Sequence, residues 1–426
     1  MSRIKDVRGR QVWDSRGWPT VEVEVTLDTG AVGRGIAPAG ASRGAHEAVE
    51  LRDGGALLGG KGVRTALAGI ERDIAPALVG LPVSDQARID RTLIDLDGTP
   101  NRSRLGGNAV VATSMAALNA AAADAGLPLW RHLAEGRPVR LPLPQIQIFG
   151  GGAHAGRRID IQDLMVIATG AGSFGQALEM TAEVYHSAGR IMAGRGLLQG
   201  VADEGGWWPA FDTNEEALDT LVRAIEGAGL VPGEDVCIAL DIAASEFGRN
   251  GRYRLGLEGV EYDSDGLCAV LLDWLDRYPI VSIEDPLAED DETGLVAFTR
   301  AAGTRVQIVG DDYLVTDARR VEAAAAKGAC NAVLLKPNQA GTITETQDAL
   351  AAAKAAGFNT IVSARSGETE DAIIVHLSTG WNAGQLKVGS FARSERMAKW
   401  NEAIRIESAG LPFFGRSALQ RPTRST

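Results

Sequence analysis

Two different rhythms of apolar and polar residues divide the chain. Residues 19–27, PTVEVEVTL, alternate valine with glutamate or threonine, and this period is typical of a half-exposed antiparallel strand. A glycine-rich loop, APAGASRGAHE, follows, and residues 62–79 and 108–126 have the spacing of helices. The three prolines of EGRPVRLPLP (135–144) indicate a hinge. We therefore predict an N-terminal α+β domain over residues 1–137.

From residue 138 onward, short apolar runs alternate with amphipathic stretches. One stretch begins at Thr213 with Glu216 three residues later, a capping box that starts a helix, and another ends at Gly357, as helices with a C-terminal glycine do. Strands that alternate with helices favour a parallel sheet. Six of the apolar runs end in a charged residue, mostly at the spacing of one βα unit: Asp241, Glu284, Asp311, Lys336, Arg365 and Lys387.

Charged residues at the carboxyl ends of successive strands favour a (β/α)8-type barrel, whose active site is built at that rim. A doubly wound open sheet would also place ligands at the carboxyl ends of its strands, so the alternation alone leaves both arrangements open. The long interval between Asp241 and Glu284 contains GRNGRYRLGLEGVEYDS, which we interpret as an insertion. We predict an α/β protein whose second domain, residues 138–426, is a barrel and carries the catalytic site.

Composition narrows the class of protein. The formal net charge is −12 and no block of lysine and arginine occurs, so nucleic acid is not an expected partner. The three cysteines, Cys237, Cys268 and Cys330, have no CxxC spacing, which indicates structural thiols in a reduced compartment. The N-terminus has no signal-like apolar segment, and no run of about 18 apolar residues occurs. We expect a cytoplasmic protein without a membrane segment.

The strand-end charges suggest a chemistry. Asp241, Glu284 and Asp311 would repel one another unless a cation lay among them, and hard oxygen ligands without histidine or cysteine suit Mg²⁺. Lys336, Arg365, Ser366 and Lys387 follow on what we expect to be the opposite side of the rim, where a guanidinium beside a hydroxyl suits a phosphate or carboxylate. The substrate expected from this pairing is a small, doubly anionic molecule.

A lysine surrounded by cations has a lowered pKa, which makes Lys336 or Lys387 a candidate general base. A proton next to a carboxylate is a very weak acid, and metal ions stabilise the enediolate that its removal leaves. Abstraction of such a proton by lysine, assisted by Mg²⁺, is therefore the reaction that we predict.

Long motifs in the sequence resemble those of the enolase (phosphopyruvate hydratase) family over nearly the whole length of the chain. They include DSRGWPTVEVEV, GASRGAHEAVELRDG, GGAHAG, ALDIAASEF, SIEDPLAEDD, LLKPNQAGTITET and SARSGETED. The resemblance implies an N-terminal α+β domain and a modified barrel that begins ββαα. It also implies interconversion of 2-phosphoglycerate and phosphoenolpyruvate in a Mg²⁺-dependent homodimer or higher oligomer, with Arg16 at the interface.

The resemblance also implies a role for each residue that matches a family motif. Asp241, Glu284 and Asp311 correspond to ligands of one Mg²⁺, and Ser42 to a ligand of a second that is supplied when its loop closes. Lys336 corresponds to the base, and Glu204, together with Asp163, to the acidic groups that assist departure of hydroxide. The substrate-binding residues implied are His154, Gln162, Arg365, Ser366 and Lys387.

Several positions at the expected site depart from the family pattern. Ala364 replaces a histidine, which removes a donor and leaves space, and Asp163 replaces a glutamate. Gly150 replaces an asparagine, Arg43 a threonine, and Pro337 a small aliphatic residue, while Arg157 and Arg158 add charge near His154. Three hypotheses follow: an enolase; a paralogue that acts on another phosphorylated or phosphonate acid, similar to carboxyphosphonoenolpyruvate synthase; and a non-catalytic binding protein.

Overall fold

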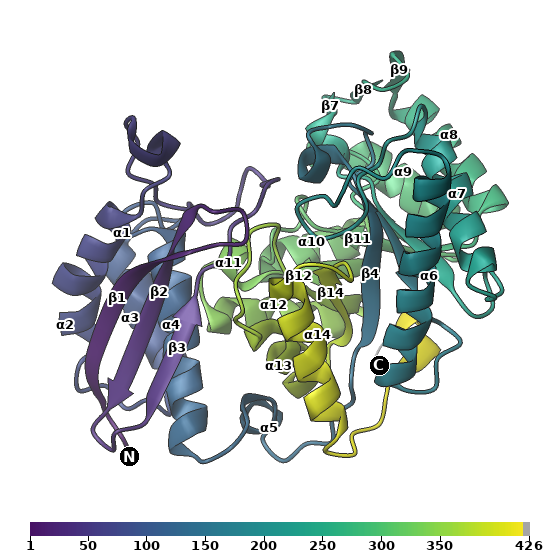
Figure 1. The fold of residues 1–426 in the computed structure, drawn as a ribbon. Helices are drawn as coiled ribbons and strands as arrows, with labels where there is room; N and C mark the ends of the chain where they lie inside the picture. Colours follow the sequence, from purple (N-terminus) through teal and green to yellow (C-terminus); the bar gives the residue numbers. More distant parts are fainter. Residues whose placement is uncertain (421–426) are drawn as a thin grey trace.

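A computed structural model describes residues 1–420. The N-terminal part contains an antiparallel sheet of order β1-β2-β3, formed by Ile4–Trp13, Pro19–Leu27 and Val32–Ile36 (Figure 1). The alternation in β2 has its predicted meaning, because Val21, Val23 and Val25 are fully buried.

Helices cover one face of this sheet. The expected helix at 62–79 is a continuous segment made of α1 (Arg64–Gly69), a π-helical turn (Ile70–Ile74) and α2 (Ala75–Leu78). It is followed by α3 (Gln86–Asp97), the largely buried α4 (Gly107–Asp124) and α5 (Leu129–Ala134). The alanines of α4 let it contact the sheet backbone closely: a Cβ on Gly33 of β3 would lie 2.1 Å from the backbone nitrogen of Ala120.

The second part is a closed barrel of order β10-β11-β12-β13-β14-β4-β5-β6, so the barrel prediction is confirmed and the open sheet is excluded. Strand β5 is antiparallel to both of its neighbours, and the other adjacent pairs are parallel. The strands are β4 (Leu143–Gly150), β5 (Asp163–Ile167), β6 (Cys237–Asp241), β10 (Ile280–Glu284), β11 (Gln307–Gly310), β12 (Ala332–Leu335), β13 (Asn359–Ser363) and β14 (Gly384–Gly389).

The order of elements begins β4-β5-α6-α7, which is the ββαα start that the family resemblance implies. The interval before β10 holds a separate small sheet, β7 (Gly248–Arg249), β8 (Arg252–Leu255) and β9 (Val260–Asp263), as expected for an insertion. The helices of this part are α6 (Phe174–Gly194), α7 (Asn214–Gly227), α8 (Ser264–Arg277), α9 (Glu292–Ala302), α10 (Ala318–Lys327), α11 (Pro337–Ala340), α12 (Ile343–Ala356), α13 (Ile373–Gly380) and α14 (Ser394–Glu407). Within residues 1–420, none of the helices combines the length and apolarity needed to cross a membrane.

Helix ends follow the predicted signals closely. The hydroxyl of Thr213 accepts a hydrogen bond from the backbone of Glu216, as a capping residue should, whereas the Glu216 carboxylate accepts from the backbone of Asp212 and not of Thr213. Gly357 ends α12 with φ = 73°, a left-handed conformation that glycine adopts without steric cost.

Side chains of the N-terminal part hold the barrel through the start of α12. Asp90 of α3 accepts hydrogen bonds from the backbone and hydroxyl of Thr344, and Ser114 of α4 accepts one from the backbone of Ile343. These side chains satisfy amides that the first turn of α12 leaves without partners. The two parts are thereby joined beside β12, where the rim of the barrel faces the N-terminal sheet.

Candidate active site

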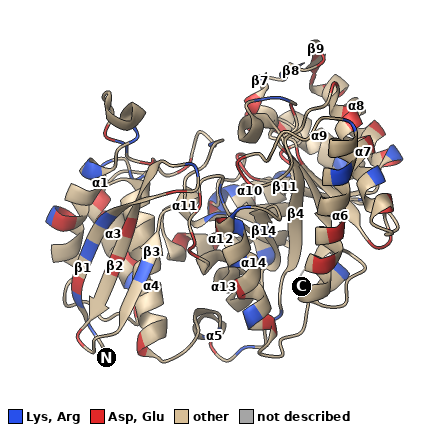
Figure 2. Ribbon diagram, viewed as in Figure 1, with Lys and Arg blue, Asp and Glu red and all other residues tan. Residues whose placement is uncertain are grey.

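The six strand-end charges meet at one rim of the barrel. Asp241 and Glu284 are the last residues of β6 and β10, while Asp311 and Lys336 follow β11 and β12 directly. Arg365 lies two residues beyond β13, and Lys387 lies within β14. All six side chains are buried. Figure 2 shows lysine and arginine near α12 and β14, where the rim faces the N-terminal part.

Lys387 occupies the centre of the acidic groups. Its Nζ lies 3.0 Å from Asp241 Oδ2, 2.9 Å from Glu284 Oε2 and 3.1 Å from Asp163 Oδ2. The prediction that the basic residues lie apart, on the opposite side of the rim, is therefore wrong for Lys387. Inward-pointing side chains of a closed barrel converge on its axis, so residues from non-adjacent strands meet.

Lys336 also faces a carboxylate. Its Nζ donates a hydrogen bond to Asp311 Oδ2, and Gln339 donates to Asp311 Oδ1 at 2.9 Å. Burial, the largest influence, lowers the pKa of Lys336, and so do Arg365 and Lys387, but the carboxylates Asp311 and Glu284 together make the net shift upward. The pKa of Lys387 is likewise raised well above its usual value, since burial is outweighed by Asp241, Glu284 and Asp163. Neighbouring cations lower the pKa of Lys336 as expected, but the expected net lowering is wrong for both lysines, because the carboxylates outweigh it.

The acidic groups retain unused capacity for a cation. Burial, and then repulsion from Asp241, raise the pKa of Glu284 well above its usual value. Two buried oxygens, Oε1 of Glu284 and Oε1 of Gln162, accept no hydrogen bond from any residue within 1–420, although the amide of Gln162 donates to Asp241 at 3.0 Å. Buried oxygen atoms without a hydrogen-bond donor suit a hard divalent ion.

Two groups of side chains in the described chain have potential ligand atoms that all lie within 4.8 Å of one another. One group consists of Asp285, Asp311 and Asp312, and the other of His154, Asp163 and Glu204. The predicted set of Asp241, Glu284 and Asp311 shares one member with the first group. The side chains that could hold a metal at this rim are therefore Asp241, Glu284 and Asp311, with Asp285 and Asp312 beside them.

A second network lies where β4 meets β5. His154, in the 3-10 turn Gly152–Ala155, places Nδ1 3.0 Å from Asp163 Oδ1. Its Nε2 lies 3.0 Å from Ser366 Oγ and 3.7 Å from Glu204 Oε1. Burial would lower the pKa of His154, but Glu204 and Asp163 together outweigh it and raise the pKa to about 9. The imidazole is therefore charged at neutral pH.

Asp163 is held as an anion by the same contacts. Burial would raise its pKa, but Lys387 and His154 outweigh that effect and hold the pKa well below its usual range. An ionised carboxylate only accepts hydrogen bonds, so the proton between the two groups lies on Nδ1 of His154. The pair gives this side of the rim one fixed negative and one fixed positive charge.

The loop that carries Ser42 covers Arg365 and Ser366. Arg365 Nη2 donates to the backbone carbonyl of Ser42 at 3.0 Å, and the backbone nitrogen of Ala41 donates to Ser366 Oγ at 3.2 Å. Only glycine fits at position 40, because a Cβ there would lie 2.1 Å from Arg365 Nη2. Glu47 of the same loop pairs with the guanidinium at 3.0 Å. Ser42 thus contacts Arg365, one of the two residues predicted to bind an oxyanion, through its backbone carbonyl.

A buried arginine supports the same segment from beneath. The side chain of Arg396, at the start of α14, is fully buried. Its Nη1 donates to the carbonyls of Arg365 and Val388, each at 2.8 Å. The backbone that presents Arg365 and Ser366 is thereby fixed to β14.

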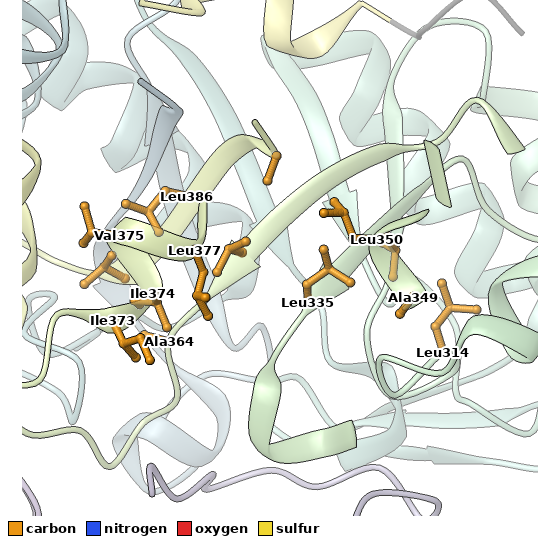
Figure 3. Packing of buried hydrophobic residues seen from close by; sticks show 14 of the residues in the cluster. Leu314, Leu335, Ala349, Leu350, Ala364, Ile373, Ile374, Val375, Leu377 and Leu386 are labelled. Atoms are coloured by element: carbon orange, nitrogen blue, oxygen red, sulfur yellow. The ribbon is translucent and has the colours of Figure 1, made fainter. Parts of the chain in front are cut away.

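Ala364 directly precedes Arg365, and its backbone nitrogen donates to the carbonyl of Lys387 at 2.9 Å. It is buried among apolar residues that include Ile373 and Ile374 of α13 (Figure 3). The apolar neighbours line the side of position 364 that faces α13.

Sequence reasoning missed several residues that support the site. Gln147 donates to Asp163, Gln339 to Asp311, and Glu47 pairs with Arg365. The available signal for Gln147 was a pair of glutamines at alternate positions in the apolar run LPQIQIFG, because a buried strand seldom contains such residues without a polar partner.

The chain is similar to known proteins along most of its length. Residues 4–133 match a family model described as the enolase N-terminal domain, and residues 138–417 match one described as the enolase C-terminal TIM barrel domain. A relative named Enolase 1, from Desulfitobacterium hafniense (strain Y51), is 51% identical over 410 residues, which cover 96% of this chain and 94% of the relative.

Proposed function

The chain belongs to the enolase family, a family of hydro-lyases, and from this premise we propose that it interconverts 2-phosphoglycerate and phosphoenolpyruvate. The observation that carries the proposal is the meeting of Lys336, the three carboxylates Asp241, Glu284 and Asp311, and the Arg365–Ser366 pair at one buried rim. Residues of the site are assigned in turn to substrate binding, metal binding, proton removal and departure of hydroxide.

Substrate binding is assigned to the basic groups. Arg365 carries a planar guanidinium suited to the phosphate. Ser366 Oγ accepts from Ala41 and faces the charged His154, so its own proton is left to donate to an oxyanion. Lys387, already among carboxylates, is positioned to hold the substrate carboxylate, and the Ser42 and His154 loops exclude water by covering the rim.

Magnesium fits the acidic groups of this rim. Asp241, Glu284 and Asp311 would hold one ion and Ser42 would contribute to a second, and the unpartnered Glu284 Oε1 supports the presence of a cation. When bound, Mg²⁺ supplies positive charge that stabilises the enediolate and balances the carboxylates.

Lys336 is proposed as the base that removes the proton from C2. Burial, Arg365 and Lys387 favour its neutral amine, while Asp311 and Glu284 favour the charged form and raise the pKa of Lys336. The same two carboxylates belong to the proposed metal-binding set. The basicity of Lys336 is therefore linked to the charge that those carboxylates carry.

Glu204 is proposed as the acid that protonates the departing hydroxyl, with Asp163 and His154 holding it in place. Glu204 is buried and lies 3.7 Å from the charged His154. Elimination needs a base and an acid at separate positions, because a proton leaves one carbon and hydroxide leaves the next. Lys336 is the base in this proposal and Glu204 is the acid.

The other two hypotheses receive less support. A non-catalytic protein would not need Lys336, Glu204 and the carboxylates in a buried, mutually paired arrangement. The phosphonate alternative depended on Ala364 and Asp163, yet Ala364 lies in apolar packing and Asp163 keeps three polar partners.

We further propose that the protein acts in the cytoplasm as a homo-oligomer. Its three cysteines are free and buried, which suits a reducing compartment. Trp13, at the end of β1, is 55% exposed and lies close in sequence to Arg16, the residue that the resemblance assigns to an interface.

The test is the conversion of 2-phosphoglycerate by the purified protein, followed by the ultraviolet absorbance of the phosphoenolpyruvate that forms. Turnover of about 1–10³ s⁻¹ that is abolished by chelation and restored by Mg²⁺ is expected. Exchange of the C2 proton with solvent, measured in parallel by NMR, separates loss of the base from loss of the elimination step. The proposal would be refuted if the protein showed no turnover and no exchange of the C2 proton at saturating Mg²⁺.

A further inference from the structure

Gln147 is a buried amide whose orientation is fixed at both ends. It lies on β4 and is 1% exposed. Its Oε1 accepts a hydrogen bond from the backbone nitrogen of Gly206 at 2.9 Å, and its Nε2 donates to Asp163 Oδ1. Because a backbone N–H can only donate, the amide oxygen must face Gly206, and the NH₂ group must face the carboxylate.

Two glycines provide the room for this side chain. A Cβ on Gly150 would lie 3.0 Å from Gln147 Oε1 and 2.7 Å from the Cβ of Ala202. A Cβ on Gly206 would lie 2.4 Å from Gln147 Oε1. Gly150 and Asp163 are both positions where this chain departs from the enolase motif, and both departures meet at Gln147.

The contact matters because Asp163 carries two further groups. Its Oδ1 also receives Nδ1 of His154, and its Oδ2 pairs with Lys387. Aspartate is one methylene shorter than glutamate, so its carboxylate is drawn back toward β5. The long side chain of Gln147 reaches it there, across the antiparallel β4–β5 pair.

We propose that Gln147 is a positioning residue for Asp163, and that the two form a length-matched pair in which the longer amide compensates for the shorter carboxylate. Gln147 acts through Asp163, and Asp163 in turn contacts His154 and Lys387. This inference rests on the proposed function for its kinetic test, but a second readout is independent of activity.

The kinetic test is a double-mutant cycle with Gln147→Asn and Asp163→Glu. Each single change alters the summed length by one methylene, and the double variant restores it. We expect each single variant to lose roughly 10- to 10²-fold in kcat with a smaller change in KM, although Asp163→Glu restores the residue of the enolase motif. The double variant should recover about tenfold or more over the poorer single variant.

Gln145→Asn is the matched control. Gln145 lies two residues earlier on the same strand, is equally buried, and bonds to Gln385 instead of Asp163. It undergoes the same loss of a methylene, and its kcat should stay near that of the wild type. A loss as large as that of Gln147→Asn would mean that strand packing, and not positioning, explains the effect.

The independent readout is the NMR signal of the Nδ1 proton of His154, in protein labelled at histidine. We expect Gln147→Asn to shift this signal and the double variant to bring it back toward its wild-type position. A wild-type protein that fails to turn over 2-phosphoglycerate would refute the proposed function but leave this arm intact. Kinetic losses that simply multiply in the double variant, or a His154 signal unmoved by Gln147→Asn, would overturn the length-matched pair.

Discussion

The rim of the barrel consists of two regions that are built differently. One, the parallel arc, carries Asp241, Glu284, Asp311 and Lys336 at the ends of parallel strands. The other, the antiparallel corner, combines Gln147 and Asp163 from β4 and β5 with His154 and Glu204 from loops. By the motif resemblance, all four residues of the arc match the enolase pattern, whereas Asp163 of the corner departs from it.

The difference shows which properties depend on topology and which on side-chain length. In the arc, a residue that directly ends a strand reaches the rim whatever surrounds it. In the corner, groups reach one another only through chains of hydrogen bonds, such as Gln147 to Asp163 to His154. Substitutions in the corner can therefore be tolerated when a neighbour changes in length as well.

The largest effect is expected from the arc. Lys336→Ala removes the proposed base, and kcat should fall by about 10⁴-fold together with exchange of the C2 proton. Both are measured on the same preparation, with thermal unfolding as the control for folding. Exchange that persists at the wild-type rate would place the base elsewhere.

The next largest effect is expected from the corner. Glu204→Gln keeps the shape but removes the acid, so kcat for dehydration should fall by about 10³-fold. Exchange of the C2 proton should continue, because Lys336 is intact. If Glu204→Gln stopped both dehydration and exchange of the C2 proton, proton removal would not be a function of the arc alone.

A smaller effect concerns the charge on His154. Its pKa is about 9 in the folded protein and about 6.5 when unfolded. A raised pKa contributes stability that is full below about pH 6.5 and is lost as the pH rises through about 9, with a maximum of about 3 kcal/mol. The difference in melting temperature between wild type and His154→Asn should therefore be large at pH 6 and small at pH 9.5. A difference independent of pH would show that His154 is not charged in the folded state.

The smallest effect is expected from Ala364→His, which introduces the histidine that the enolase motif has at this position. Ala364→His should lower the free energy of unfolding by about 2 kcal/mol, because it inserts a larger polar group into apolar packing. Activity should change less than threefold, roughly within the scatter of a neutral substitution. Denaturant unfolding and kcat measure the two quantities, and a tenfold gain in kcat would show that position 364 does belong to the site.

Much of the fold and of the arc could be predicted from the sequence, because both follow from repetition. The alternation of β2, the ends of α7 and α12, and the strand-end charges are local signals that the structure retains. The position of Lys387 could not be predicted, because its partners lie on β5, β6 and β10, and the order of strands in the closed barrel is not a local property.

The contacts within the corner could not be predicted from the sequence for a related reason. The contact between Gln147 and Asp163 depends on the β4–β5 register, which is irregular between Gln147 and Phe149. The raised pKa of Lys336 depends on Asp311 and Glu284, which lie at the ends of other strands. For Ala364, a strand-end position in sequence did not reveal that its side chain packs with α13.

The seam between β4 and β14 sets a condition on how the protein is made. It joins residues about 240 positions apart, as in the bond between Gln145 and Gln385, and Arg396 fastens the oxyanion-binding segment from still further along the chain. A chain emerging from the ribosome at about 5–20 residues per second can complete its N-terminal sheet early. Its barrel stays open until β14 has been synthesised, so a nascent or truncated chain exposes the unpaired edges of β4 and β13, which are sites where strands of other chains can pair.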